Sequence, residues 1–382
     1  MKFLQSLALP KFALWNKMRE SAGIVSFDLE LTSRCNNNCR HCYINLPAQD
    51  RQAKAKELKA DEISGIAEQA VSLGALWCLL TGGEPLLRED FFDIYLSLKK
   101  SGLLVSVFTN AALITDEHIR FFKKYPPRDI EVTVYGVTQE IYEKVTRVPG
   151  SFVKFSRGLD LLLASGLKVR LKTMILRSNV RELPKISSFC REITKDYFRF
   201  DAFLHLRFDG DAHRNGEIKT ERLSSKEIVD IEKSDPERFK ALQKGCDQLI
   251  FSESCSSCCN HLFHCGAGKG GFSVSYDGFF RLCSSLWQKD CIVDLRKVSL
   301  ADARNNLIPK VRDMRSSKEE FLKRCRVCPI INLCLWCPAH AHLETQEMDA
   351  PVEYFCEVAH ARAKSIENNE ETRKSYAKKK TE

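Results

Sequence analysis

Three cysteines stand close together near the N-terminus and could hold metal. They are Cys35, Cys39 and Cys42, within the stretch CNNNCRHC. Three neighbouring thiolates can bind three irons of a four-iron cluster and leave the fourth iron open, whereas a closed structural site normally takes four ligands. The alternative interpretation is a zinc knuckle completed by a distant cysteine or by His41.

The composition indicates where such a metal site would have to work. The chain has 382 residues, 17 of them cysteines, with 44% hydrophobic and 29% charged residues, which is ordinary for a globular protein. Disulfides need an oxidising compartment. The N-terminal apolar run is broken by Pro10, Lys11 and Lys17 and lacks a small-residue cleavage site, so it predicts an amphipathic helix rather than a signal peptide. No apolar stretch reaches membrane-spanning length. We therefore expect a cytoplasmic protein that binds iron–sulfur clusters or zinc.

The net charge of +9 does not by itself indicate a partner. Apart from Lys378, Lys379 and Lys380, the basic residues are scattered along the chain. Scattered charge is typical of a solvated surface, so we expect neither a nucleic acid nor a membrane as partner.

The elements that position the cysteines alternate between strand and helix. Apolar and β-branched runs predict strands at 24–31, 76–81, 103–110, 129–136, 168–176 and 198–206. Amphipathic patterns between them predict helices at 61–73, 88–101, 115–124, 151–165 and 181–195. Strands separated by helices imply parallel βα units. The pattern leaves open whether the sheet is flat or curled into a barrel, but in both cases the chemistry lies beyond the carboxyl ends of the strands.

The polar and glycine-rich motifs fall at those strand ends. CNNNCRHC follows the first strand, and the segment GGEP, Gly82 to Pro85, follows the second. The third strand ends at Thr109 and Asn110, and the fourth at Tyr135-Gly136. These motifs therefore share one edge of the predicted sheet.

With its motifs placed after successive strands in this order, the chain resembles the radical S-adenosylmethionine (SAM) enzymes. CNNNCRHC looks like their CxxxCxxC signature, and GGEP is similar to the segment that holds the amino group of the cofactor's methionine portion. Gly82 and Gly83 allow close backbone approach, and Glu84 is an anionic partner for an ammonium group. The resemblance also implies further SAM contacts: His41 near the adenine, Thr109, Asn110, Thr133, and Arg147 as a carboxylate or ribose partner.

The resemblance implies a fold and a first chemical step. The fold is an α/β partial (β/α)6 TIM-like barrel, followed by a C-terminal cysteine-rich auxiliary-cluster domain. Cys35, Cys39 and Cys42 would hold a [4Fe-4S] cluster whose open iron binds S-adenosyl-L-methionine. Reductive cleavage of this cofactor gives a 5′-deoxyadenosyl radical that abstracts hydrogen from the substrate.

The pattern changes after about residue 210, and cysteine is dense from Cys246 to Cys356. We expect five segments: an N-terminal helical extension over 1–23, the partial barrel over 24–210, a helical linker over 211–244, the auxiliary-cluster domain over 245–360, and a charged tail over 361–382.

The C-terminal cysteines resemble the SPASM domain of radical SAM enzymes, which holds two auxiliary [4Fe-4S] clusters. Cys265 and Cys283 flank an apparent hairpin turn at Tyr276-Asp277-Gly278. The family's ligation pattern implies one cluster held by Cys259, Cys265, Cys283 and Cys337, and a second held by Cys325, Cys328, Cys334 and Cys356.

Three alternatives accompany this assignment. Cys255 and Cys258 are rival fourth ligands of the first auxiliary cluster, an open iron there is a further option, and Cys-x2-Cys pairs also suit zinc. The remaining cysteines are interpreted as buried hydrophobes: Cys78, Cys190, Cys246 and Cys291.

The substrate is less defined than the reaction class. The resemblance implies a peptide- or protein-modifying maturase, with oxidative decarboxylation or side-chain cleavage of a tetrapyrrole or another small molecule as the alternative. Ser284 stands where the sulfatase-maturing branch has an aspartate, which disfavours formylglycine formation. Tyr135 either faces the substrate, as a late proton or electron donor, or packs at the strand end.

Partners follow from the same reasoning. About 24 residues precede the first strand, too few for a fused leader-binding domain, so a peptide substrate needs a separate leader-peptide-binding protein or direct recognition by the barrel. An electron donor such as flavodoxin or ferredoxin is also implied. A metal-stabilised nucleic-acid-binding protein is the non-enzyme alternative, and it would leave GGEP unexplained.

Overall fold

The computed structural model describes residues 24–194, 198–249 and 260–367. The helix expected over 1–23 therefore lies outside the described residues, as do Cys255, Cys258 and Cys259. The chain divides into two compact units. We call residues 24–201 with 265–311 the barrel unit, and residues 202–264 with 312–367 the helical unit.

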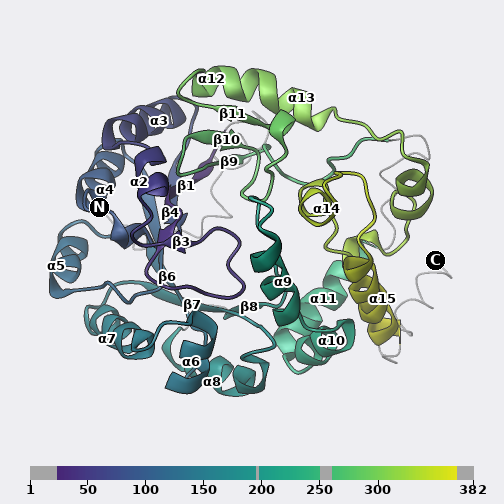
Figure 1. The fold of residues 1–382 in the computed structure, drawn as a ribbon, viewed down its shortest axis with the longest axis horizontal. Coiled ribbons are helices and arrows are strands. Elements are labelled where there is room, and N and C mark those ends of the chain that lie inside the picture. The colour runs from purple at the N-terminus through teal and green to yellow at the C-terminus, as the bar shows by residue number, and fades with distance from the viewer. Residues whose placement is uncertain (1–23, 195–197, 250–259, 368–382) are drawn as a thin grey trace, which may run out of the picture. The chain divides into compact units, whose positions relative to one another are not determined.

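A nine-stranded sheet forms the barrel unit (Figure 1). Its spatial order is β11 (Ile292–Asp294), β10 (Phe279–Arg281), β9 (Gly271–Val274), β1 (Ser26–Thr32), β4 (Trp77–Gly82), β5 (Leu104–Thr109), β6 (Asp129–Thr133), β7 (Val169–Met174) and β8 (Arg199–Asp201). The run from β9 to β8 is parallel, and β10 and β11 are antiparallel. The six predicted strands and the partial TIM-like barrel are therefore confirmed.

Helices cover the outer face of this sheet (Figure 1). The five predicted ones are α3 (Ala60–Ser72), α4 (Phe91–Lys100), α5 (Asp116–Lys124), α7 (Ser151–Ala164) and α8 (Leu183–Ile193). Apolar strand side chains such as Val105, Val107 and Val132 are fully buried. In β6 the alternate residues Asp129, Glu131 and Thr133 are polar, and Lys172 Nζ of β7 lies 2.6 Å from Glu131 Oε1. One face of β6 thus builds the core, and the other carries polar groups.

Two short strands and two short helices between residues 34 and 146 were not expected from the sequence. They are β2 (Arg34–Cys35) paired with β3 (Leu46–Pro47), the helix α2 (Arg51–Lys56), and the helix α6 (Gln139–Thr146). Helix α6 begins after Thr138, whose side chain accepts a hydrogen bond from the Ile141 backbone N–H. It ends at Arg147, which has the left-handed φ of 56°.

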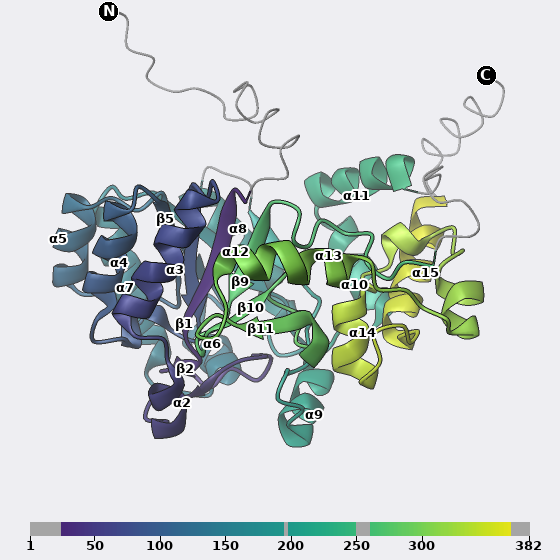
Figure 2. The same ribbon diagram turned by 90° about the horizontal axis from the view of Figure 1, so that it is seen from above.

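The segment 271–294 extends the barrel sheet (Figures 1 and 2). Strand β9 pairs with the edge of β1, and the predicted hairpin turn leads from β9 to β10 with Gly278 at φ 91°. Phe272 of β9 stacks on Phe27 of β1 at 5.2 Å between ring centroids. The sequence assigned this segment to a separate domain from 245 onward. It joins the barrel unit because β1 offers an unpaired strand edge.

The helical unit contains α9 (Ala212–Glu221), α10 (Ser225–Lys233), α11 (Pro236–Leu249), α14 (Pro338–Thr345) and α15 (Glu353–Glu367). The segment expected as a helical linker, 211–244, contains α9, α10 and most of α11, and Pro236 begins the last of these helices. Helix α15 continues beyond residue 361, where a charged tail was expected, because Arg362 and Ile366 are buried. Within the described residues, no helix combines the length and apolar character that crossing a membrane requires.

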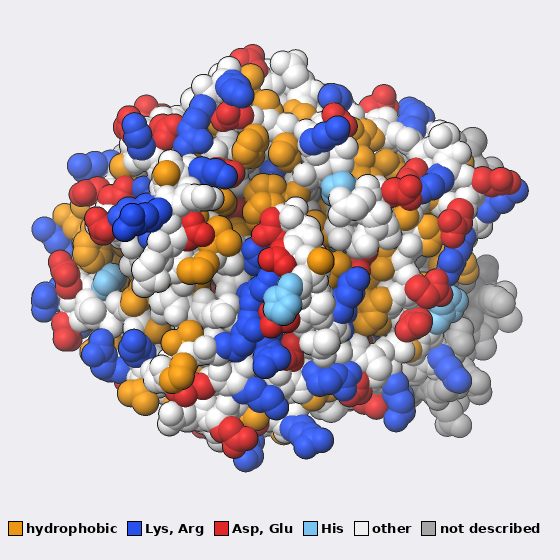
Figure 3. All heavy atoms as spheres, viewed as in Figure 1, with side chains coloured by type: hydrophobic (Ala, Val, Ile, Leu, Met, Phe, Trp, Pro, Cys, Tyr) orange, Lys and Arg blue, Asp and Glu red, His pale blue; other side chains and the backbone are white. Residues whose placement is uncertain are grey.

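Charged side chains are intermixed on the molecular surface. Figure 3 shows Lys and Arg spread among Asp and Glu over the face in view. This pattern agrees with the scattered positive charge of the sequence.

Candidate functional site

The first three cysteines lie together in the loop that follows β1. Cys39 is buried, and Cys35 and Cys42 are half-buried. Burial raises the pKa of the Cys35 thiol well above its usual value, and negative charge at Cys39, Glu84 and Cys42 raises it further. Burial and then Cys42 raise the pKa of Cys39 in the same way. Each thiol therefore lies within electrostatic reach of the others.

Helix α6 anchors this loop. The backbone N–H of Asn38 donates to Thr146 O at 2.9 Å, and that of Arg40 donates to Val145 O at 3.3 Å. Arg147 Nε donates to Asn38 O at 2.9 Å. Helix α6 was not predicted from the sequence, although Thr138 ahead of Ile141, Tyr142 and Val145 is an N-cap followed by an apolar period. Arg147, expected to contact the cofactor, holds the cysteine loop.

The GGEP segment forms backbone hydrogen bonds with the residues that lead into the cysteine loop. Gly83 N–H donates to Thr32 O at 2.6 Å, and Glu84 N–H donates to Arg34 O at 2.9 Å. A Cβ atom at Gly83 would lie 2.2 Å from Arg34 O, and one at Gly82 would lie 2.3 Å from Thr32 O. Glycine is therefore required here by the approach of the chain's own backbone.

The carboxylate of Glu84 organises the third strand end. It is fully buried and accepts hydrogen bonds from Thr109 Oγ1 at 2.8 Å, Asn110 N at 2.7 Å and Leu86 N at 3.1 Å. Burial raises its pKa to about 7, against the lowering effect of these three donors. Thr109 and Asn110, expected as cofactor contacts, converge on Glu84.

Asn110 also connects this segment to the cysteines. Its Nδ2 donates to Asn36 Oδ1 at 2.8 Å and lies 3.8 Å from Cys35 Sγ. The first, second and third strand ends thus meet through side chains that the sequence singled out. Thr133 lies at the end of the neighbouring β6 and is half-buried.

His41 and Tyr135 pack against each other beside the loop. Their ring centroids are 5.2 Å apart in an edge-to-face arrangement, and Tyr135 also contacts Tyr142. Burial lowers the pKa of His41 to about 4, so its ring is neutral at pH 7. A hydrogen bond from the Tyr135 side chain lowers the pKa of Cys39. The strand-end tyrosine therefore supports the cysteine loop.

The residue types of this loop suit an iron–sulfur cluster, in which each thiolate binds a different iron, although no three Cys, His, Asp or Glu side chains among the described residues are grouped to hold a single metal ion. Three thiols and a carboxylate converge where burial and mutual repulsion disfavour their anionic forms, so a bound cation would relieve both. Asn37 is buried, and neither atom of its side-chain amide has a hydrogen-bond partner among the described residues. A buried amide of this kind needs a polar partner that the described residues do not supply.

The later cysteines are distributed over both units. Cys265 and Cys283 belong to the barrel unit, where negative charge at Cys265 contributes to raising the pKa of Cys283 after burial. Arg281, fully buried before Cys283, pairs with Glu30 at 2.8 Å and donates to Ser284 O at 2.7 Å. Cys259, the fourth ligand implied by the resemblance, lies outside the described residues.

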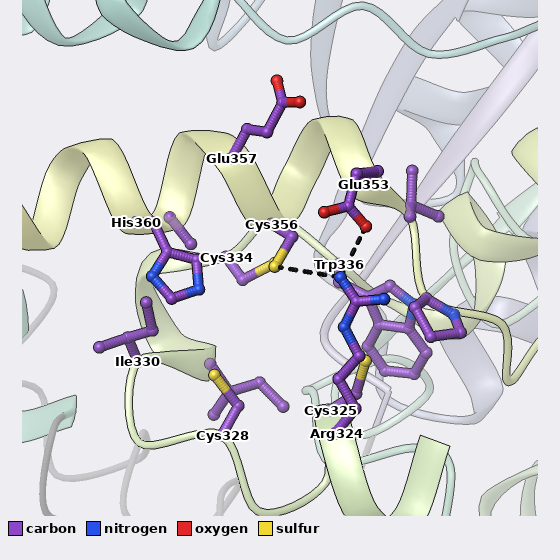
Figure 4. Close-up of a pocket in the computed structure, with 14 residues that line it drawn as sticks. Arg324, Cys325, Cys328, Ile330, Cys334, Trp336, Glu353, Cys356, Glu357 and His360 are labelled. Carbon is purple, nitrogen blue, oxygen red and sulfur yellow. Dashed lines mark hydrogen bonds and ion pairs between the residues drawn. The ribbon is translucent and has the colours of Figure 1, made fainter. Parts of the chain in front are cut away.

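Four cysteines of the helical unit line one cavity of about 360 Å³ (Figure 4). They are Cys325, Cys328, Cys334 and Cys356. Burial is the largest cause of the raised pKa of Cys334, and charge at Cys356, Cys325 and Cys328 adds to it. The structure thus brings together the four thiols that the sequence grouped, three from a turn region and one from α15.

Cys337 is absent from the lining of this cavity. It caps the N-terminus of α14, where its sulfur accepts from the His340 backbone N–H at 3.4 Å. Three further cysteines without a motif partner are buried: Cys78, Cys190 and Cys291.

Comparison with known proteins finds a family match within the barrel unit. Residues 29–190 match the family model described as the Radical SAM superfamily. The AdoMet-dependent heme synthase of Methanosarcina barkeri is 29% identical over 164 residues, which cover 43% of this chain and 46% of the relative. The chain therefore spans about half the length of that relative.

Two solved structures share the fold over most of the chain. Native anSMEcpe with bound AdoMet has a TM-score of 0.61 and 15% identity, covering 88% of this chain and 95% of that one. Streptococcus suis SuiB bound to precursor peptide SuiA has a TM-score of 0.60 and 15% identity, covering 91% and 81%. At such identities the likeness establishes a shared fold.

Proposed function

We propose that this chain, whose barrel is a radical SAM domain, cleaves S-adenosylmethionine reductively and removes hydrogen from a peptide or protein side chain. The observation that carries the proposal is the convergence of Cys35, Cys39 and Cys42 with Glu84 at the carboxyl ends of the parallel strands. This edge is where α/β folds bind their cofactors.

The chain's own residues bind and orient in this proposal. Cys35, Cys39 and Cys42 would hold the [4Fe-4S] cluster, and the backbone of the segment 82–85 would meet the methionine amino group. Glu84 adds negative charge to that contact and is held by Thr109 and Asn110. When bound, the cluster and S-adenosylmethionine supply a 5′-deoxyadenosyl radical. Thr133 and His41 would contact the nucleoside, and Arg147 would fix the loop.

Two auxiliary [4Fe-4S] clusters belong to the same proposal. The cavity that joins Cys325, Cys328, Cys334 and Cys356 supports the second one. The proximity of Cys265 to Cys283 supports part of the first one, and its remaining ligands rest on the sequence resemblance alone.

The proposal of a peptide substrate is supported by the fold shared with SuiB, whose solved structure has the precursor peptide SuiA bound. A separate leader-peptide-binding protein and a flavodoxin- or ferredoxin-type electron donor complete the proposed partners, in the cytoplasm. The second candidate is oxidative decarboxylation of a tetrapyrrole propionate, which the 29% identity to a heme synthase favours.

Formation of 5′-deoxyadenosine tests the catalytic site. Anaerobically reconstituted enzyme with dithionite and S-adenosylmethionine should release it, and the triple variant Cys35→Ala, Cys39→Ala and Cys42→Ala should not. Cys78→Ala with Cys190→Ala is the matched control, because these buried cysteines belong to no motif. Product from the triple variant would refute the assignment.

Iron content tests the auxiliary clusters. Three four-iron clusters require about twelve irons per chain. Replacing Cys325 and Cys328 with Ser should remove about four irons and leave 5′-deoxyadenosine formation in place. This assignment would be contradicted if the reconstituted wild type contained mainly zinc. It would also be contradicted if the double variant bound as much iron as the wild type.

Mass spectrometry separates the two substrate classes. Loss of two hydrogens from a cysteine- or aromatic-containing peptide supports the maturase. Loss of carbon dioxide with two hydrogens from a propionate-bearing tetrapyrrole, with the same peptides unchanged, would replace it with the second candidate.

A further inference from the structure

One guanidinium reaches a thiol in the four-cysteine cavity of the helical unit (Figure 4). Arg324 Nη2 donates toward Cys356 Sγ at 3.8 Å, and the same nitrogen lies 2.6 Å from Glu353 Oε2. Arg324 immediately precedes Cys325, whereas Cys356 and Glu353 lie on α15. This side chain therefore connects two of the segments that carry the four thiols.

The carboxylate of Glu353 fixes the direction of the guanidinium. Arg324 Nη1 also lies 3.7 Å from Glu320 Oε1, one helical turn earlier. The 2.6 Å bond to Glu353 directs Nη2 toward α15, where Cys356 lies, although the Arg324, Glu320 and Glu353 side chains are 44%, 60% and 66% exposed.

Arg324 is the one guanidinium or ammonium group among the described residues that line the cavity. The other ionisable lining residues besides the cysteines are Glu353, Glu357 and His360. Figure 4 shows Arg324 and His360 on different sides of Cys356. Hydrogen bonds and positive charge at a cluster's sulfur ligand stabilise the reduced state, which carries one more electron, and so raise its reduction potential.

We propose that Arg324 is a positioning residue that donates a hydrogen bond to the Cys356 sulfur and raises the reduction potential of the cluster held by Cys325, Cys328, Cys334 and Cys356. The inference rests on the proposed function, because it requires that cluster. It adds a reason why this cysteine turn begins with arginine: the residue sets the potential at which the cluster accepts an electron.

Potentiometric titration of the reconstituted full-length chain, followed by electron paramagnetic resonance, tests the inference. The signal of this cluster is the component that disappears when Cys325 and Cys328 are both changed to Ser. Arg324→Gln removes the hydrogen bond and the charge, whereas Arg324→Lys keeps only the charge. Lys323→Gln is the matched control, because it removes a neighbouring charge whose ion pair with Glu319 touches no cysteine.

We expect the midpoint of that component to become more negative in Arg324→Gln, to move less in Arg324→Lys, and to stay in place in Lys323→Gln. A midpoint potential in Arg324→Gln equal to that in Lys323→Gln overturns the inference but leaves the assignment of the cluster to these four cysteines intact. Loss of the signal in both Arg324 variants also overturns it, since Arg324 would then be needed for assembly rather than for tuning. Absence of the component from the wild type refutes the auxiliary cluster and the inference together.

Discussion

A buried ion pair holds α15 to α10 inside the helical unit. Arg362 Nε donates to Glu232 Oε2 at 3.0 Å, its Nη2 donates to Glu232 Oε1 at 2.6 Å, and its Nη1 donates to Leu333 O at 2.9 Å. The two side chains are only 5% and 3% exposed. Because α15 also carries Cys356, the pair stabilises one wall of the four-cysteine cavity.

Removing either partner leaves a charge buried without its counter-ion. Such a loss costs about 3–5 kcal/mol of stability. Glu232 keeps a second partner in Arg238, whose Nη2 lies 3.3 Å away. We therefore expect Arg362→Met to fall near the lower end of that range and Glu232→Met near the upper end. The double change to Met should recover part of the loss, because neither charge is then buried.

Hydrogen exchange measured peptide by peptide is the suitable assay, because it reports the local stability of α10 and α15 separately from that of the barrel unit. Protection of α10 and α15 should fall in both single variants and partly return in the double one. Lys226→Gln, in an exposed pair with Asp230 on α10, is the control and should leave protection unchanged. Single variants that behave like this control, or a double variant less protected than both, would refute the reasoning.

Three further changes probe the barrel unit. Gly83→Ala places a Cβ 2.2 Å from Arg34 O and should lower the free energy of denaturant unfolding by at least about 2 kcal/mol. The control Gly65→Ala meets open space in α3 and should not destabilise the protein. Equal denaturation midpoints for the two variants would contradict this prediction. Burial lowers the pKa of Lys172 to about 8 from 10.5, so the folded state binds fewer protons between these values. Stability of the wild type relative to Lys172→Met should therefore rise by about 3 kcal/mol from pH 8 to 10.5, and parallel curves would count against it. Thr138→Ala removes the cap of α6 and should cost about 1 kcal/mol, seen as faster exchange in the cysteine loop but not in α3.

The strands and the positions of the main motifs could be predicted from the sequence because both depend on local patterns. Runs such as 103–110 alternate with amphipathic helices, and parallel topology then brings the ends of β1, β4 and β5 to one edge. The meeting of Cys35, Glu84 and Asn110 follows from that topology.

The contacts within the site could not be predicted in the same way. Arg147 resembled a cofactor contact in the sequence, but its position depends on α6, whose N-cap and short apolar period were not used in the prediction. Thr109 and Asn110 were placed correctly on a strand end, yet their bonds to Glu84 depend on the exact register of β4 and β5. The extent of the barrel unit also depends on long-range contacts, since pairing between β1 and β9 joins residues far apart in the chain.

The pairing of β9 with β1 has a consequence for how the protein is made. Ser26 pairs with Gly271, so the strand that leads into the cysteine loop leaves the ribosome long before its neighbour does. During that interval the edge of β1 presents unpaired backbone groups, which are prone to join other chains. Such distant pairing also slows folding. The nascent barrel therefore passes through an aggregation-sensitive stage, and its yield should depend on chaperones and on the speed of translation across the middle of the gene.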